Sequence, residues 1–272
     1  MSKLITKVKM VMSGRLSLLK VAYLYGKCLL TPAPKEFKAL KNRHKGEKCY
    51  IVALGPSLTI DDLDSINRHG EICFSVNGIF GLFDKTSWRP NYYFMSDPPE
   101  DDTCQFMKDF ERRKSDFDVC FYNQFFRSKY RDDAIPYKAN TAHNVLQNSK
   151  CKWIRRLDYR CKFSRDASKF VYDGNTCIIS VIQLAYYMGF SRIYLLGADC
   201  SSKDTMHHAD GVAFEIVDMD GEKKAWDDMQ IDYYYMNKDL IKKKIPIEII
   251  NVTRGGSLEV FPRMTLEESL GE

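Results

Sequence analysis

The sequence predicts an α/β protein with a doubly wound, mostly parallel sheet, and a basic helical arm at its N-terminus. Apolar runs of strand length alternate with segments of helical periodicity that are long enough to cross over between parallel strands. Residues 1–48 contain twelve Lys or Arg and two Glu, a net charge of +10, whereas the rest of the chain contains 29 basic and 34 acidic side chains. The overall charge of +5 therefore comes from the N-terminal part of the chain.

The expected elements follow one another from residue 49 onward. We expect strands at about residues 49–55, 71–77, 91–96, 117–122, 192–198 and 246–252, and helices at about residues 60–67, 102–113, 175–188 and 227–243. The stretch Thr31-Pro32-Ala33-Pro34 is typical of a linker. We therefore divide the 272 residues into an amphipathic arm with its linker, residues 1–34, and one α/β domain, residues 35–272.

The nine cysteines indicate a reducing compartment. They are odd in number, lie mostly inside apolar runs, and form no C-x-x-C pair. This pattern favours buried thiols over a disulfide framework or a zinc site. We therefore expect a cytoplasmic protein.

The basic arm allows two interpretations. Lys and Arg interrupt each of its apolar runs, so it contains neither a span of about 20 apolar residues nor the apolar region of a signal peptide. It predicts either a peripheral helix on the anionic inner face of a membrane, or a basic helix packed against its own body or a partner subunit. A homo-oligomer stays open, and no feature of the chain calls for a nucleic acid.

Small and polar residues follow five of the predicted strands, at the point where each strand ends. They are Gly55-Pro56-Ser57-Leu58, Asn77-Gly78, Ser96-Asp97-Pro98-Pro99, Tyr122-Asn123 and Gly197-Ala198-Asp199. Each group alone is explained by turn geometry. In an open parallel sheet, however, ligands bind beyond the carboxyl ends of the strands. Five such groups on one edge of a sheet predict a ligand site.

The first strand end has the features of a phosphate cradle. Gly55 allows a sharp turn, Pro56 fixes φ, and Ser57 can donate hydrogen bonds to an anionic oxygen from both its hydroxyl and its backbone. The segment is neither a P-loop nor a dinucleotide fingerprint. The alternative is a plain Gly-Pro turn in which Ser57 or Thr59 caps the following helix.

A second candidate phosphate element lies in residues 172–190. Gly174, in a turn expected at the surface, precedes Asn175 and Thr176, and either of these can cap a helix that is apolar almost all round. The N-terminus of such a helix attracts phosphate through its dipole and its backbone N–H groups. The alternative is an ordinary capped core helix.

These segments carry a family resemblance over about residues 47–263. The stretches "IVALGPSL", "FSVNGI", "YYFMSDP" and "YDGNTCIISVIQLAYYMGFSRIYLLGADCS" resemble the MptE-like family, which has the 6-hydroxymethylpterin diphosphokinase domain. They resemble more distantly the bacterial lipooligosaccharide sialyltransferases, in the G-P-S-L strand end, the asparagine that closes the second strand, and the G-x-D after the helix. Both resemblances imply a Rossmann-like domain that holds a nucleotide. The second implies that Gly55, Pro56, Ser57, Asn77 and the turn at residues 174–176 surround the nucleotide of a CMP-sugar.

Two departures from the sialyltransferase pattern bear on the chemistry. Ser201 stands where those enzymes place a tyrosine on the donor phosphate, with Lys203 nearby as a cationic replacement, and Asp97 stands where they end the third strand in asparagine. Asp97 and Asp199 together could hold Mg²⁺ on a diphosphate, which makes Mg²⁺ the one candidate cofactor. The alternative is that both aspartates cap helices or bind ribose hydroxyls.

Glycosyl transfer with inversion needs a general base on the acceptor hydroxyl and a group that stabilises the departing nucleotide. His207 and His208, in the polar loop that follows the fifth predicted strand, are the candidate bases, with Asp199 next; the alternative is that both histidines are solvated. We favour a glycosyltransferase that uses a CMP-sialic-acid-like donor on a surface polysaccharide or glycolipid acceptor, because the arm would bring it to a membrane. The alternatives are a Mg²⁺-dependent diphosphotransferase of the 6-hydroxymethylpterin diphosphokinase type and a non-catalytic nucleotide-binding module.

Overall fold

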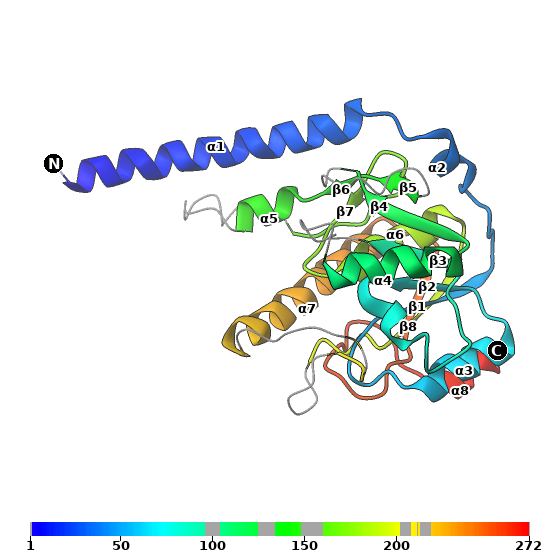
Figure 1. Cartoon of the computed structure of the whole chain (residues 1–272). Coiled ribbons are helices and arrows are strands. Elements are labelled where there is room, and N and C mark those ends of the chain that lie inside the picture. The colour runs from blue at the N-terminus through cyan, green and yellow to red at the C-terminus, as the bar shows by residue number, and fades with distance from the viewer. Residues whose placement is uncertain are drawn as a thin grey trace.

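The computed structural model describes residues 2–95, 104–124, 134–147, 160–201, 208–210, 212 and 219–271. Figure 1 shows a layered α/β body, with a long N-terminal helix running along one side of it. The arrangement confirms the predicted fold class.

The body is built on a parallel sheet of seven strands in the order β5-β4-β3-β2-β1-β8-β9. The strands are β1 Lys48–Val52, β2 Cys73–Val76, β3 Tyr92–Met95, β4 Val119–Asn123, β5 Ala134–Tyr137, β8 Arg192–Leu196 and β9 Glu248–Asn251. The chain moves outward from β1 to β5 and then returns to place β8 on the other side of β1. The strand order thus reverses between β1 and β8, which is the point where open α/β sheets bind ligands.

All six predicted strands are present, and three further strands are not among the predicted ones. Two of these, β6 Ala139–Asn140 and β7 Val171–Tyr172, form a separate parallel pair of only two residues each. The third, β5, lies at the edge of the main sheet and contains Pro136. Proline cannot donate to a sheet and is confined largely to edge strands, which agrees with the position of β5.

The helices are α1 Ser2–Leu30, α2 Lys35–Ala39, α3 Ile60–His69, α4 Gln105–Arg113, α5 Ala142–Gln147, α6 Cys177–Tyr187, α7 Met219–Lys242 and α8 Leu266–Leu270, with 3-10 turns η1 Asn77–Leu82 and η2 Lys114–Asp116. The four predicted helices correspond to α3, α4, α6 and α7, with shifted ends. Local chemistry sets these ends in α3, where Thr59 and Asp62 form a reciprocal capping box and Gly70, at φ 64°, ends the helix. The capping alternative for Thr59 is therefore correct.

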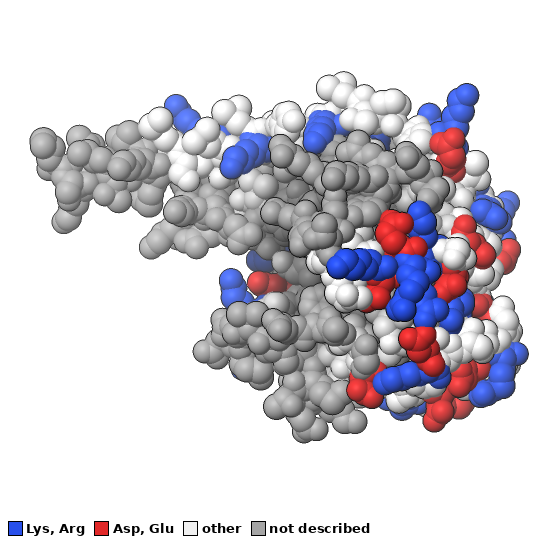
Figure 2. All heavy atoms as spheres, in the orientation of Figure 1, with Lys and Arg blue, Asp and Glu red and all other residues white. Residues whose placement is uncertain are grey.

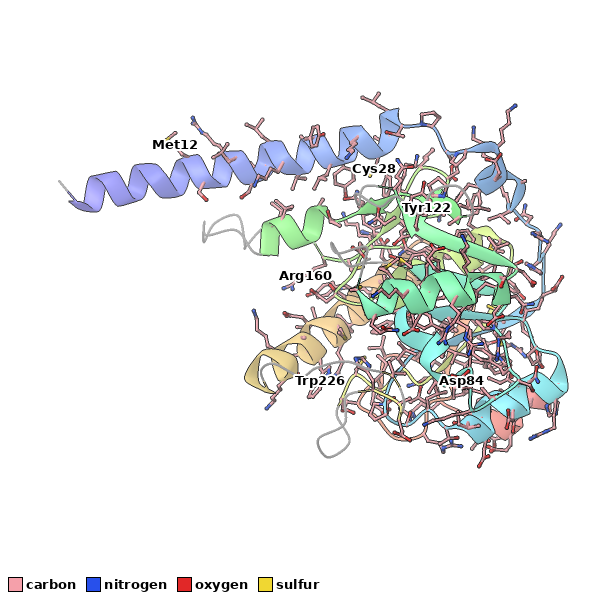
Figure 3. All side chains as sticks on the ribbon, in the orientation of Figure 1. Met12, Cys28, Asp84, Tyr122, Arg160 and Trp226 are labelled. Carbon is pink, nitrogen blue, oxygen red and sulfur yellow. The ribbon has the colours of Figure 1, made fainter. Side chains whose placement is uncertain are left out.

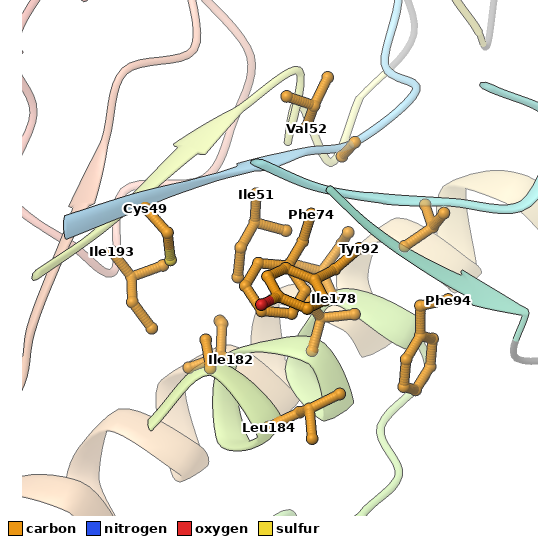
Figure 4. Close-up of a cluster of buried hydrophobic side chains, with 14 of the residues drawn as sticks. Cys49, Ile51, Val52, Phe74, Tyr92, Phe94, Ile178, Ile182, Leu184 and Ile193 are labelled. Carbon is orange, nitrogen blue, oxygen red and sulfur yellow. The ribbon is translucent and has the colours of Figure 1, made fainter. Parts of the chain in front are cut away.

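Helices cover both faces of the sheet. On one face Ile178 and Ile182 of α6 pack beneath Ile51 and Phe74 (Figure 4). Side chains alternate along a strand, so Tyr93 points to the other face, where its ring stacks on Phe110 of α4 with the centroids 5.5 Å apart. Each fully buried side chain of this kind contributes about 1.5–3 kcal/mol to folding. This apolar core holds the strand ends in place.

The arm packs one of its faces against the body. Val21 of α1 contacts Ala142 and Leu146 of α5 in a small buried cluster. The buried Lys138 donates through Nζ to two backbone oxygens at the end of the helix, those of Cys28 (3.0 Å) and Thr31 (2.7 Å). The interpretation of the arm as a packed helix thus holds for this face. Among the described helices, none combines the length and the apolar character needed to cross a bilayer.

Candidate functional site

A pocket of about 300 Å³ opens at the carboxyl ends of β1, β2 and β8, where the strand order reverses. The start of α6 and one face of α7 complete its wall. Its lining consists of Ala53, Leu54, Gly55, Val76, Asn77, Asn175, Thr176, Cys177, Ile178, Gly197, Ala198, Asp199, Cys200, Ser201, His208, Trp226, Met229 and Tyr233. Figure 3 shows the position of Trp226 on α7, on the side of the body away from α1.

Two glycine turns let the ends of β1 and β8 approach each other. The Gly55 N–H donates to the Gly197 carbonyl over 2.8 Å. A Cβ at Gly55 would lie 1.9 Å from Asp199 Oδ2 and 2.5 Å from the Gly197 oxygen, while Gly197 itself adopts φ +68° with Ala53 O only 2.8 Å from its Cβ position. Neither position accommodates a side chain without movement. The two turns therefore pack directly against each other, and both glycines line the pocket.

Asp199 is the carboxylate of the pocket and is almost fully buried. Burial raises the pKa of Asp199 above its ordinary value, and this is opposed by hydrogen bonds from the Ser57 hydroxyl and backbone and by the charge of Arg263. The Ser57 hydroxyl donates to Asp199 Oδ2 over 2.8 Å. It therefore holds the aspartate, and Ser57 is not among the residues that line the pocket.

The start of α6 is held by a buried aspartate of α7. Thr176 is the N-cap residue, with its hydroxyl accepting from the Ile178 N–H (3.4 Å). Asp232 Oδ2 accepts from both the Asn175 N–H (2.8 Å) and Asn175 Nδ2 (2.6 Å). Burial raises the pKa of Asp232 to about 6, although the Asn175 hydrogen bonds oppose the shift. The Asn175 N–H, which we expected to face a phosphate, is thus used within the protein.

Gly174 corrects one expectation, because it is buried and does not lie in a surface turn. A Cβ at this position would lie 2.7 Å from Ile179 Cδ1. Gly174 therefore packs behind the turn that carries Asn175 and Thr176, and it does not line the pocket.

His208 lies at the mouth of the pocket, tied to the end of β1. Its Nδ1 is 3.3 Å from the Leu54 carbonyl oxygen, which also accepts from the Ala209 N–H over 2.9 Å. A carbonyl only accepts, so this contact assigns the proton of a neutral ring to Nδ1 and makes Nε2 the basic nitrogen. Three other predicted site residues, His207, Lys203 and Asp97, lie outside the described residues.

Of the remaining predicted site residues, Asn77 lines the pocket, at φ 45°, and its carbonyl accepts from the Tyr93 hydroxyl (2.7 Å). Pro56, Leu58, Gly78 and Asn123 are not among the lining residues. Asn123 ends β4, which is separated from β1 by two strands. The structure thus does not bring Asn123 to the other strand ends.

Comparison with known proteins places the chain in a family. The family model described as "6-hydroxymethylpterin diphosphokinase MptE-like" matches residues 28–205. The chain belongs to the MptE-like family. This confirms the resemblance found in the sequence, and the match includes the strand ends and the start of α6 but not α7. No curated protein matches the chain.

The MptE-like chain is also similar to a solved structure, that of the MAf glycosyltransferase from Magnetospirillum magneticum AMB-1. The two share 13% identity with a TM-score of 0.50, over 84% of this chain and 35% of that one. At this identity the similarity shows the fold alone. The chain spans about a third of the length of the MAf chain.

The wall that α7 gives the pocket of this MptE-like protein was not predicted from the sequence. One face of α7 lines the pocket with Trp226, Met229 and Tyr233. Met229 and Tyr233 follow Trp226 by three and seven residues, which is helical spacing. The spacing indicates that the three side chains share one face of a helix, but it does not reveal which cavity that face lines. Asp232 was missed as well, because a single aspartate in a polar helix gives no sign of being buried.

The described residues of the MptE-like pocket do not by themselves make a metal site. Among them, no group of three or more His, Cys, Asp or Glu side chains could hold a metal ion. Asp199 is the one carboxylate in the described lining. A Mg²⁺ site at Asp97 and Asp199 stays a prediction, and no chemical step below depends on it.

Proposed function

We propose that this protein is a glycosyltransferase that binds a nucleotide-activated sugar, with a CMP-sugar favoured as the donor. The observation that carries the proposal is the pocket between the two glycine turns and the start of α6, at the reversal of strand order. In open α/β sheets nucleotides bind at this place, with their phosphates near glycine turns and helix N-termini. Membership of the MptE-like family supports a transferase of this broad kind.

The pocket suggests a division of roles for the proposed reaction. The donor phosphate would lie near the start of α6, and the aromatic wall of α7 would contact the base or sugar through Trp226 and Tyr233. His208 Nε2 would accept the proton of the acceptor hydroxyl as the new glycosidic bond forms and the nucleotide leaves. Asp199 would bind sugar hydroxyls or assist as an acid or base.

We propose a glycan or glycolipid acceptor and a cytoplasmic site of action. Within the described part of the chain, eight cysteines are free, as expected in a reducing compartment. A peripheral position at the inner face of a membrane and a homo-oligomeric state remain proposals.

A Mg²⁺-dependent diphosphotransferase is the second candidate, favoured by the description of the matching family model. A third candidate is a nucleotide-binding module without catalysis. All three place a nucleotide in the same pocket, so the identity of the nucleotide and its need for metal distinguish the first two.

A thermal-shift panel of CMP, CDP, UDP, GDP and ATP, each with and without Mg²⁺, tests the proposal. A ligand at 100 times its Kd stabilises the folded state by about 2.7 kcal/mol, which gives a measurable shift of the unfolding midpoint. Since a CMP-sugar is the proposed donor, we expect the largest shift with CMP and no dependence on Mg²⁺. Trp226→Ala should reduce the shift, because Trp226 lines the pocket. Tyr234→Ala is the matched control on the same helix, since Tyr234 is exposed and lies outside the pocket.

A shift with ATP that requires Mg²⁺ would favour the diphosphotransferase. Binding of any nucleotide that Trp226→Ala leaves unchanged would argue against this pocket as the site.

A further inference from the structure

The arm exposes a second apolar stripe that the body does not cover. Its members are Met12 (59% exposed), Leu16 (57%), Leu19 (66%), Tyr23 (66%) and Leu30 (85%). They are spaced four, three, four and seven residues apart, which returns each side chain to the same face of a helix. From Met12 to Leu30 the stripe is about 27 Å long.

The opposite face of the same helix is the one that packs against the body. Ser17, Val21 and Cys28 are buried there. Figure 3 shows the two faces, with Met12 on the outer edge of α1 and Cys28 on the edge that faces the body. The helix therefore carries two apolar stripes, one used for packing and one turned outward.

Cations flank the outer stripe, and the helix itself contains no acidic side chain. Arg15, Lys20 and Lys27 lie on the two sides of the stripe in the helical projection. Residues 2–30 contain six Lys or Arg and no Asp or Glu. In Figure 2 the described part of the helix accordingly carries blue and white atoms.

We propose that the outer stripe of α1 docks this protein onto an anionic phospholipid surface. A helix of this kind lies in the plane of the interface, with its apolar stripe at the boundary of the acyl chains and its cations at the depth of the headgroups. The buried stripe and the contacts of Lys138 hold the helix on the body, so that docking of α1 brings the whole protein to the surface. The inference goes beyond the proposed activity and does not depend on the donor pocket.

Charge distinguishes lipid from the other occupant that the spacing allows, a second copy of this chain. Apolar residues at alternating steps of three and four are also typical of a helix–helix seam. Two copies of α1 would place Arg15, Lys20 and Lys27 against the same cations, with no acidic side chain in the helix to compensate. An anionic headgroup layer, in contrast, is complementary to these cations.

Vesicle flotation with the full-length protein tests the proposal. The vesicles contain phosphatidylcholine alone, or phosphatidylcholine with phosphatidylserine in a ratio of about 7 to 3, a mixture with a negative surface potential. We expect binding to the mixed vesicles that is at least ten-fold stronger than to phosphatidylcholine, and that weakens as salt is added. The charge variant Arg15→Gln/Lys20→Gln should bind about 25-fold more weakly, at roughly five-fold for each charge.

A variant of the outer stripe distinguishes docking through α1 from nonspecific hydrophobic adsorption to the vesicles. Leu16→Ser/Leu19→Ser/Tyr23→Ser should weaken vesicle binding at least ten-fold, because it removes apolar groups that would enter the interface. The matched control is Tyr234→Ser/Ile241→Ser on α7, which removes side chains exposed to 53% and 66% from another surface. It should bind as the wild type does. The thermal unfolding midpoints of both variants should stay close to that of the wild type, since all the substituted side chains are exposed.

Equal flotation of the stripe variant and the wild type would overturn the proposal, as would equal binding to both kinds of vesicle. Absence of flotation, together with a dimer in sedimentation that the stripe variant converts to monomer, would assign the stripe to a second copy of the chain. Nucleotide binding, measured separately, should be the same in every variant.

Discussion

Ser57→Ala should destabilise the protein by removing a hydrogen bond to a buried charge. The Ser57 hydroxyl donates to Asp199 Oδ2 over 2.8 Å, and the carboxylate is only 6% exposed. A hydrogen bond to a charged group contributes about 1.5–3 kcal/mol. The backbone N–H of Ser57 also donates to this carboxylate and remains in the variant. We therefore expect a loss of about 1.5–2 kcal/mol at pH 7.5, at the lower end of that range.

The pH dependence of this loss follows from the raised pKa of Asp199. A carboxyl whose pKa is higher in the folded state binds more protons there than in the unfolded state, so its contribution to stability falls as the pH rises from the ordinary value through the raised one. Loss of the Ser57 hydrogen bond raises the pKa further, because that bond favours the charged form. The destabilisation by Ser57→Ala should therefore be larger at pH 7.5 than at pH 4.

Urea unfolding of a double-mutant cycle measures the interaction. The cycle combines Ser57→Ala with Asp199→Asn at both pH values, and Ser191→Ala is the control, since its hydroxyl is exposed at the opposite end of β8 and should change stability by less than about 0.5 kcal/mol. A coupling energy below about 0.5 kcal/mol at pH 7.5, or one that does not shrink at pH 4, would refute the assignment of Ser57 as the group that holds Asp199.

Three further substitutions test other parts of the site. Gly55→Ala should destabilise the protein by about 1–3 kcal/mol or more in urea unfolding, because its Cβ would lie 1.9 Å from Asp199 Oδ2; Gly26→Ala, with open space around it, should instead stabilise by about 0.5–1 kcal/mol. Asp232→Asn should remove a pH dependence of the free energy of unfolding. The pKa of Asp232 is raised to about 6, so ionisation of this carboxyl lowers wild-type stability on the order of 3 kcal/mol between pH 4 and pH 8. Equal slopes of unfolding free energy against pH in the two proteins would contradict this. His208→Ala should lower turnover about 10²- to 10⁴-fold with calorimetric nucleotide affinity unchanged, because a base acts on the acceptor; full activity of the variant would move the base elsewhere.

Strand ends were predictable because they depend on local patterns. Gly55, Asn77, Gly197 and Asp199 each follow a short apolar run, and all four line the pocket. Their convergence also needs β1, β2 and β8 to be neighbours, which depends on the strand order. The pattern does not reveal that order. Asn123 ends an equally clear strand, and the pattern of strand ends therefore predicted that it lies with the pocket residues. The strand β4, however, is separated from β1 by β3 and β2, and Asn123 does not line the pocket.

Contacts between distant segments were not predictable in this way. Asp232 binds the Asn175 turn across 57 residues of sequence, and in the chain it is one of several acidic residues in a polar helix. Its burial follows from the contact of α7 with the turn before α6, which the local sequence pattern does not reveal. The same holds for Trp226 and Tyr233, whose helical spacing predicts a buried face but not its neighbour.

The arm shows why a periodicity analysis can describe a helix and still mislead about its use. Amphipathicity is judged by summing apolar character around the helix axis, so apolar residues on opposite faces cancel. The cations between the two apolar faces then do not gather on a single polar face. The structure separates the two stripes, because α5 covers the face of Val21 and leaves the face of Leu19 exposed. Packing against the body and the proposed docking on an anionic surface, treated as alternatives from the sequence, would use different faces of the same helix. Because α1 is packed against the body, the proposed docking of its outer stripe would also hold the body, and with it the pocket, close to the surface.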